Sequence, residues 1–82
     1  MPEQPYERIT GAVSEHTGGR PLTPEEATAL LALARRVAHV SDDRRAAPLV
    51  CYLAGQALAG EPDEAARLAR IREIEALFPE PG

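Results

Sequence analysis

Apolar residues recur at helical spacing in four segments of the chain, and no segment shows the alternation typical of a half-buried strand. The clearest segment begins at "TPEE", where Thr23 can cap a helix, Pro24 suits its first position and Glu26 can close a capping box. We therefore predict a helix over residues 24–39. Its apolar stripe follows the spacing i, i+3, i+4, i+7: Ala27, Leu30, Leu31, Ala34, Val37 and Ala38.

A second helix is predicted over residues 46–59, where almost every side chain is apolar. A helix that is apolar all round is expected to be buried, so this segment is predicted to be the central, most enclosed helix. Gln56 is its polar exception, apart from a tyrosine hydroxyl, and should either hydrogen-bond across the fold or lie on a face that a partner covers. Small residues recur every four positions and should permit close packing: Ala47, Cys51, Gly55 and Ala59.

Two flanking segments carry weaker helical patterns. Residues 5–16 place Tyr6, Ile9 and Val13 on one face. Residues 62–78 begin with Pro62, and their apolar positions again follow a helical repeat: Leu68, Ile71, Ile74 and Phe78. In this last helix Arg67 is predicted to pair with Asp63 along the exposed side. Residues 79–82 are expected to form a frayed tail.

Four helices with short connections predict an all-α fold, a compact four-helix bundle with a buried, small-residue-rich third helix. The 82 residues allow one domain, residues 1–82. A chain of this size buries only roughly 60% of the surface that it exposes when unfolded. Large apolar side chains are few, so a homodimer through the first or fourth helix would add needed buried surface.

The composition narrows the cellular compartment and the classes of partner that are expected for this chain. Cys51 is the single cysteine, which suits a reducing compartment and a buried, unreactive thiol. The N-terminus lacks the apolar core of a signal peptide, and the longest apolar run is shorter than the roughly 20 residues of a membrane helix. We expect a soluble, cytoplasmic protein that does not associate with membranes. The net charge of -4 gives no general attraction to nucleic acid.

A cluster of basic residues brackets the joint between the second and third helices. Asp42 and Asp43 lie within this joint and can neutralise it. Arginine forks suit phosphates and carboxylates, so three interpretations stay open: self-paired surface charge, contact with an acidic protein surface, or binding of a phosphorylated small ligand. The candidate partner-binding or anion-binding residues are Arg35, Arg36, His39, Arg44 and Arg45.

Catalytic chemistry is weakly supported. No His or Cys spacing matches a metal site, and no cofactor-binding loop is present. Cys51 lies within an apolar helix, where burial would raise its pKa and make it a poor nucleophile. A hydrolase or transferase using His39 with Asp42 or Asp43 would require these side chains to converge in a concave site. We therefore expect no catalytic residues, no metal, no cofactor and no enzymatic activity.

The stretch from Leu30 to Gly60 resembles the actinobacterial family known as domain of unknown function 6457. The family pattern is a helix ending "LAR-x-VAH", then "R-x-AAPL", then an apolar helix with a glycine-containing end. The matching segments here are "LALARRVAHV", "RRAAPL" and "YLAGQALAG". His39, Arg45 and Pro48 fall on these motifs. Family members often have a tryptophan in their first helix, where this chain has Tyr6.

The resemblance implies a biological setting. Family members occur alone and as appendages to molybdenum cofactor guanylyltransferase-like proteins. It therefore implies a role in molybdenum cofactor maturation or molybdoenzyme assembly, with a nucleotidyltransferase or maturation factor as protein partner. Our leading hypothesis is a non-enzymatic accessory module that binds this partner through the charged joint. The alternative is a homo-oligomer that binds a small phosphate-bearing ligand among the joint arginines.

Overall fold

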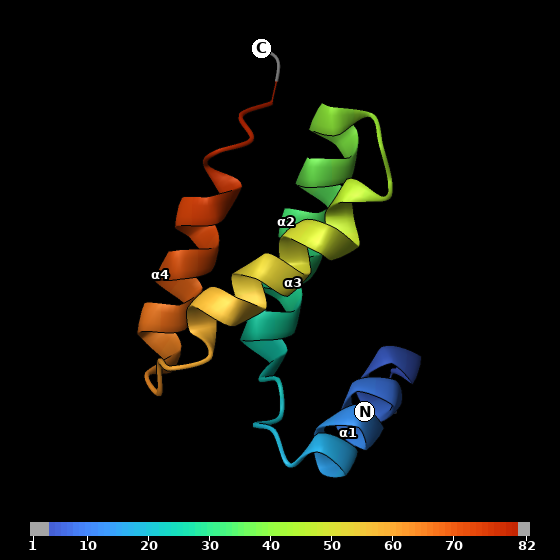
Figure 1. Ribbon diagram of the computed structural model, residues 1–82, viewed down its shortest axis with the longest axis vertical. Helices are drawn as coiled ribbons and strands as arrows, with labels where there is room; N and C mark the ends of the chain where they lie inside the picture. The colour runs from blue at the N-terminus through green and yellow to red at the C-terminus, as the bar shows by residue number, and fades with distance from the viewer. Residues whose placement is uncertain (1–3, 81–82) are drawn as a thin grey trace.

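The computed structural model describes residues 4–80, which contain four α-helices and no strand (Figure 1). The predicted all-α, four-helix fold is confirmed. The helix ends differ from prediction by a few residues, most at the last helix, which begins later because Asp63 is its N-cap and accepts a hydrogen bond from the Ala66 backbone N–H. The helices are α1 (Pro5–Thr17), α2 (Pro24–Ser41), α3 (Ala46–Leu58) and α4 (Glu64–Glu75).

The start of α2 forms as its sequence predicts. The Thr23 side chain accepts a hydrogen bond from the Glu26 backbone N–H at 3.1 Å, and a Glu26 carboxylate oxygen accepts one from the Thr23 N–H at 3.4 Å. Together they make a capping box that satisfies two backbone donors at the helix start. The first turn of α2 is therefore fixed by local chemistry.

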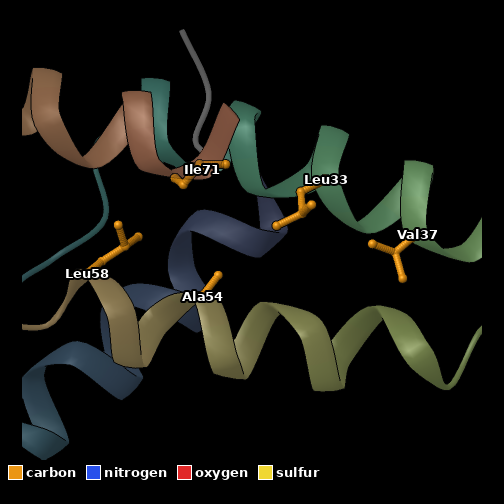
Figure 2. Close-up of a cluster of buried hydrophobic side chains, with 5 residues drawn as sticks. All are labelled: Leu33, Val37, Ala54, Leu58 and Ile71. Atoms are coloured by element: carbon orange, nitrogen blue, oxygen red, sulfur yellow. The ribbon is translucent and has the colours of Figure 1, made fainter. Parts of the chain in front are cut away.

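The core is built around α2, which packs against both α3 and α4 while α3 also touches α4. Five buried side chains from these three helices point toward one another in Figure 2: Leu33, Val37, Ala54, Leu58 and Ile71. The buried side of α2 is rotated by part of a turn from the predicted apolar stripe. Leu33 is fully buried, whereas Leu31, which the prediction placed in the stripe, is 53% exposed. Leu33 lies one turn from Val37, and this pair marks the true centre of the buried side.

The third helix is less enclosed than predicted. Only Ala54 and Leu58 are buried in α3, and α2 buries more residues than α3 does. Leu49, Tyr52 and Leu53 are exposed by 65%, 68% and 60%. The prediction that this helix is the most enclosed one is wrong, because α2 and α4 cover only one of its sides and no other helix between residues 4 and 80 covers the opposite one.

Helix α1 stands apart from the other three helices (Figure 1). Within residues 4–80 its backbone comes close to none of them and it has no buried residue, and its side nearest to α2 shares only a hollow of about 230 Å³ with the start of that helix, lined by Tyr6 and Pro24 among others. It ends at Gly18, which adopts the left-handed conformation with φ 72°, so that the chain turns away from the helix axis. The core of the molecule is therefore formed by α2, α3 and α4.

A buried ion pair joins the start of α2 to α4. Glu26 and Arg67 are only 2% and 3% exposed, and two hydrogen bonds of 3.0 and 3.2 Å join the guanidinium to the carboxylate. Arg67 also donates to the Glu61 carbonyl oxygen at 3.0 Å. The predicted pairing of Arg67 with Asp63 is wrong: the arginine points inward, because there it can satisfy a buried carboxylate and a loop carbonyl together.

Candidate functional site

Three of the five candidate residues share a groove beside the end of α2. Arg35, Arg36 and His39 line a hollow of about 350 Å³ together with Ala32, Glu75 and Glu80. A neighbouring hollow of about 420 Å³ continues toward the start of α2 and shares Ala32 and Glu75 with the first. We call the two together the α2–α4 groove. Its other lining residues are Pro24, Glu25, Thr28, Ala29, Leu68, Ile71 and Arg72.

The groove has an apolar floor and a charged rim. The floor is made by small and apolar side chains of α2 and α4, among them Ala32 and Ile71, and the rim carries both signs of charge. Along α2 it runs from Pro24 to His39, which corresponds to about 22 Å at 1.5 Å per residue. A groove of this length and polarity suits an amphipathic partner helix better than a small charged ligand.

Arg36 already has partners within the chain. Its guanidinium donates a hydrogen bond to the Phe78 carbonyl oxygen at 3.3 Å. It also lies 3.5 Å from a Glu80 carboxylate oxygen and 3.9 Å from one of Glu75. These contacts hold the segment after α4 against α2, so Arg36 shapes the groove, whereas Arg35, His39 and Arg72 are exposed basic residues of its rim.

The joint between α2 and α3 forms a second, separate group. Asp43 accepts three hydrogen bonds from Arg45, one from its backbone N–H at 3.0 Å and two from its guanidinium at 3.1 and 3.2 Å. These hydrogen bonds lower the pKa of Asp43 below its ordinary value. Arg44 is exposed beside them. Neither Arg44 nor Arg45 lines the α2–α4 groove.

This division bears on the anion-binding alternative. A phosphate held by the joint would have to displace the Asp43 carboxylate from the Arg45 fork and from the Arg45 backbone N–H. Arg36 is meanwhile engaged by Phe78 and its neighbouring carboxylates. The self-paired interpretation describes Arg45 well, and binding of a small phosphate-bearing ligand stays a prediction.

His39 and Cys51 show no catalytic geometry among the described residues. His39 is exposed, and no hydrogen bond joins it to Asp42 or Asp43 within residues 4–80. Cys51 is half-buried, with its Sγ 4.0 Å from the Leu30 carbonyl oxygen, and burial raises the pKa of the thiol. A raised thiol pKa reduces the thiolate fraction at neutral pH and so the reactivity of Cys51.

One surface that the sequence did not reveal lies on the outer side of α3. Leu49, Tyr52, Leu53 and Gln56 are all exposed and lie on one face at the spacing i, i+3, i+4, i+7. We call this set the α3 stripe. It contains no charged side chain, and Gln56 belongs to it instead of bonding across the fold. The sequence feature that could have indicated this surface is the lack of charged residues in α3, and that is the same feature from which we predicted a buried helix.

Two further properties concern the described part of the chain. Between residues 4 and 80, no group of three or more histidine, cysteine, aspartate or glutamate side chains is arranged to hold a metal ion. In the same range no helix combines the length and the apolar character that crossing a membrane requires. Three surfaces of the described chain have now been defined by their residues, namely the α2–α4 groove, the joint and the α3 stripe.

Comparison with known proteins gives a family. No curated protein matches this sequence, and no solved structure matches it either. The match to a family profile covers residues 2–81, nearly the whole chain and well beyond the segment from Leu30 to Gly60 that carries the motif resemblance. The chain thus belongs to the family described as domain of unknown function (DUF6457).

Proposed function

We propose that this chain is a non-enzymatic helical interaction module that binds a protein partner in the α2–α4 groove. The observation that supports it most is the gathering of Arg35, Arg36 and His39 in one groove with an apolar floor. Helix-binding grooves use such a floor for affinity and the charges at their edge for orientation. The exposed rim residues Arg35 and His39 lie one helical turn apart and can contact the same partner segment.

The resemblance to actinobacterial family members supplies the setting of this proposal. Because such domains occur as appendages to molybdenum cofactor guanylyltransferase-like proteins, the proposed partner is a nucleotidyltransferase or another molybdoenzyme maturation factor in the cytoplasm. The chain would act as an accessory protein in cofactor maturation or molybdoenzyme assembly. His39 falls on the family motif and lines the groove, so one residue links the two arguments.

The experiment measures binding of the purified chain to the molybdenum cofactor guanylyltransferase of the same organism by calorimetry. The double variant Arg35→Ala with His39→Ala should weaken binding at least about tenfold, as expected when exposed anchor residues of an interface are truncated. Its matched comparison is Arg44→Ala with Arg45→Ala, which removes two exposed basic residues from the joint. Circular dichroism should show both variants folded.

Each outcome of this experiment distinguishes between the groove and the joint as the binding surface. Weaker binding only in the Arg35 and His39 variant supports the groove, whereas weaker binding only in the Arg44 and Arg45 variant moves the contact to the joint. Equal affinity of both variants and the wild type would exclude both surfaces. If the wild-type chain does not bind the guanylyltransferase at all, the molybdenum setting of the proposal is wrong.

A further inference from the structure

The α3 stripe is an unusual surface for a monomer. Leu49, Tyr52 and Leu53 are each at least 60% exposed and adjoin one another along the helix. The polar groups of the stripe are the Gln56 amide and the Tyr52 hydroxyl. Monomeric proteins rarely leave contiguous large apolar side chains in water, and such a patch usually marks an interface.

Helix α1 also exposes an apolar face to solvent. Tyr6, Ile9 and Val13 form an apolar stripe on one face, which we call the α1 stripe, and they are 40%, 64% and 57% exposed. The charged side chains of this helix, such as Arg8 and Glu15, lie on the opposite face. An isolated helix of this length is marginal in water, so α1 needs a surface against which to bury its stripe.

The surface area of the whole chain indicates the same missing contact. The chain exposes 6162 Å². A folded monomer of 8.8 kDa is expected to expose about 4,800 Å², so the surplus is about 1,400 Å². A stable protein–protein interface removes about 800 Å² from each partner. The surplus is therefore large enough to be covered by one interface of ordinary size.

We propose that the α1 stripe of one chain packs on the α3 stripe of a second copy, and that two such contacts form a two-fold symmetric dimer. The two stripes match in chemistry, since both are apolar and neither brings a charge into the contact. Two-fold symmetry uses both stripes of both copies, so that no apolar helix face is left over. The groove proposed to bind another protein lies between α2 and α4 and stays open in this dimer.

The linker favours the second copy over the chain's own α1. The α3 stripe lies on the side of α3 opposite Ala54 and Leu58, which face the core. To reach it, residues 18–23 would have to extend around α3, about two helix diameters or 20 Å, which is their full extended length. This linker is shortened instead: the Gly19 N–H donates to the Ser14 carbonyl oxygen at 3.1 Å, and the Ser14 hydroxyl donates to the Gly19 carbonyl oxygen at 2.8 Å.

The first test measures the mass of the full chain in solution by light scattering across a concentration series. We expect twice the mass of one chain. Ile9→Asp in α1, or Leu53→Asp in α3, should weaken dimerisation at least about 100-fold, because each places a charge in an apolar contact. Arg8→Asp on the opposite face of α1 and Ala69→Asp on exposed α4 are matched controls that should remain dimeric.

The second test identifies which helices meet. In a Cys51→Ala background, one chain carries Ile9→Cys and a differently tagged chain carries Leu53→Cys, two positions near the centres of their stripes. Mixed chains should form a disulfide between the two tags under mild oxidation. When Arg8→Cys replaces Ile9→Cys, the yield of the mixed disulfide should fall at least about tenfold. A disulfide needs closely approaching Cβ atoms, and Arg8 lies on the opposite face of α1.

Three results would overturn the proposal. The first is a wild-type chain that stays monomeric at the highest concentration. The second is a dimer that neither Ile9→Asp nor Leu53→Asp weakens. The third is a dimer that only Leu53→Asp weakens and that gives no mixed disulfide with Ile9→Cys, because it would join two α3 stripes without α1. None of these results touches the groove proposal, which is tested by a different partner and by variants of Arg35 and His39.

Discussion

At the scale of single residues, the Glu26 carboxylate holds more of the fold together than any residue of the charged joint. It accepts a hydrogen bond from the Thr23 N–H at the start of α2 and two from the Arg67 guanidinium of α4. Arg67 extends the same network to the loop after α3 through the Glu61 carbonyl oxygen. The pair therefore fixes how α2, α4 and that loop meet.

Removing the arginine should destabilise the protein strongly. In Arg67→Ala the Glu26 carboxylate remains buried without its counter-ion, and a buried unpaired charge is among the most damaging single changes. We expect the melting temperature to fall by at least about 10 °C. Replacing both partners by apolar residues, Glu26→Leu with Arg67→Met, should recover most of the loss. A fall of only one or two degrees in Arg67→Ala would show that the pair is not held in the dry core.

The sequence predicted one half of this network and missed the other. The capping box followed from "TPEE" because Thr23 and Glu26 are three residues apart, and local spacing decides such contacts. Arg67 and Glu26 lie 41 residues apart, and nothing in the spacing distinguishes Glu26 from Asp63 as the partner of Arg67. The ion pair depends on how α2 and α4 pack, which is not encoded in any one segment.

At the scale of elements, the joint between α2 and α3 depends on a residue in an unfavourable backbone conformation. Asp42 caps α2 in the left-handed region with φ 54°. A residue with a Cβ is strained there, and a carboxylate at a helix C-terminus also opposes the helix dipole. Asp42→Gly should therefore stabilise the protein by about 0.5–1 kcal/mol.

The control for this prediction separates strain from charge. Asp42→Ala removes the carboxylate and keeps the Cβ, so it should gain less than Asp42→Gly or lose stability. Urea unfolding of the three proteins gives the comparison through their free energies of unfolding. If alanine stabilises as much as glycine does, the charge and not the backbone limits the joint.

The elements also show which parts of the fold sequence patterns can predict. Helix ends are set by local signals, and the starts of α1, α2 and α3 at Pro5, Pro24 and Ala46 agree with prediction. The burial of α3 was overestimated because a charge-free sequence cannot tell a helix covered on all sides from one that leaves a face for another chain. The candidate basic residues do not form one cluster, because two of them have partners that the sequence pattern did not predict. Asp43 accepts hydrogen bonds from Arg45 within the joint, and the segment after α4 accepts one from Arg36.

At the scale of the whole molecule, the buried Glu26 carboxylate makes the stability of the fold sensitive to acid. Burial alone would raise the pKa of Glu26, but the hydrogen bonds from Arg67 and Thr23 outweigh it and keep the pKa below its ordinary value. Because the folded-state pKa lies below the unfolded one, the stabilisation is complete above the unfolded value of about 4.3 and is lost as pH falls through the folded-state pKa. The pKa of Asp43 shifts in the same direction, but its side chain is 42% exposed and solvent screens its charge, so its contribution is small.

The melting temperature should therefore stay level with respect to Glu26 from pH 7 to about pH 5 and fall steeply below about pH 4. Glu26→Gln should melt lower than the wild type at pH 7, because it leaves the Arg67 charge without its counter-ion, and should lose much less stability between pH 5 and pH 3. Asp43→Asn should keep nearly the full wild-type slope. Calorimetric melting of the three proteins over this pH range decides the matter. If wild type and Glu26→Gln lose stability in parallel, the acid sensitivity arises from exposed carboxylates, and the buried pair does not control the stability of this fold in acid.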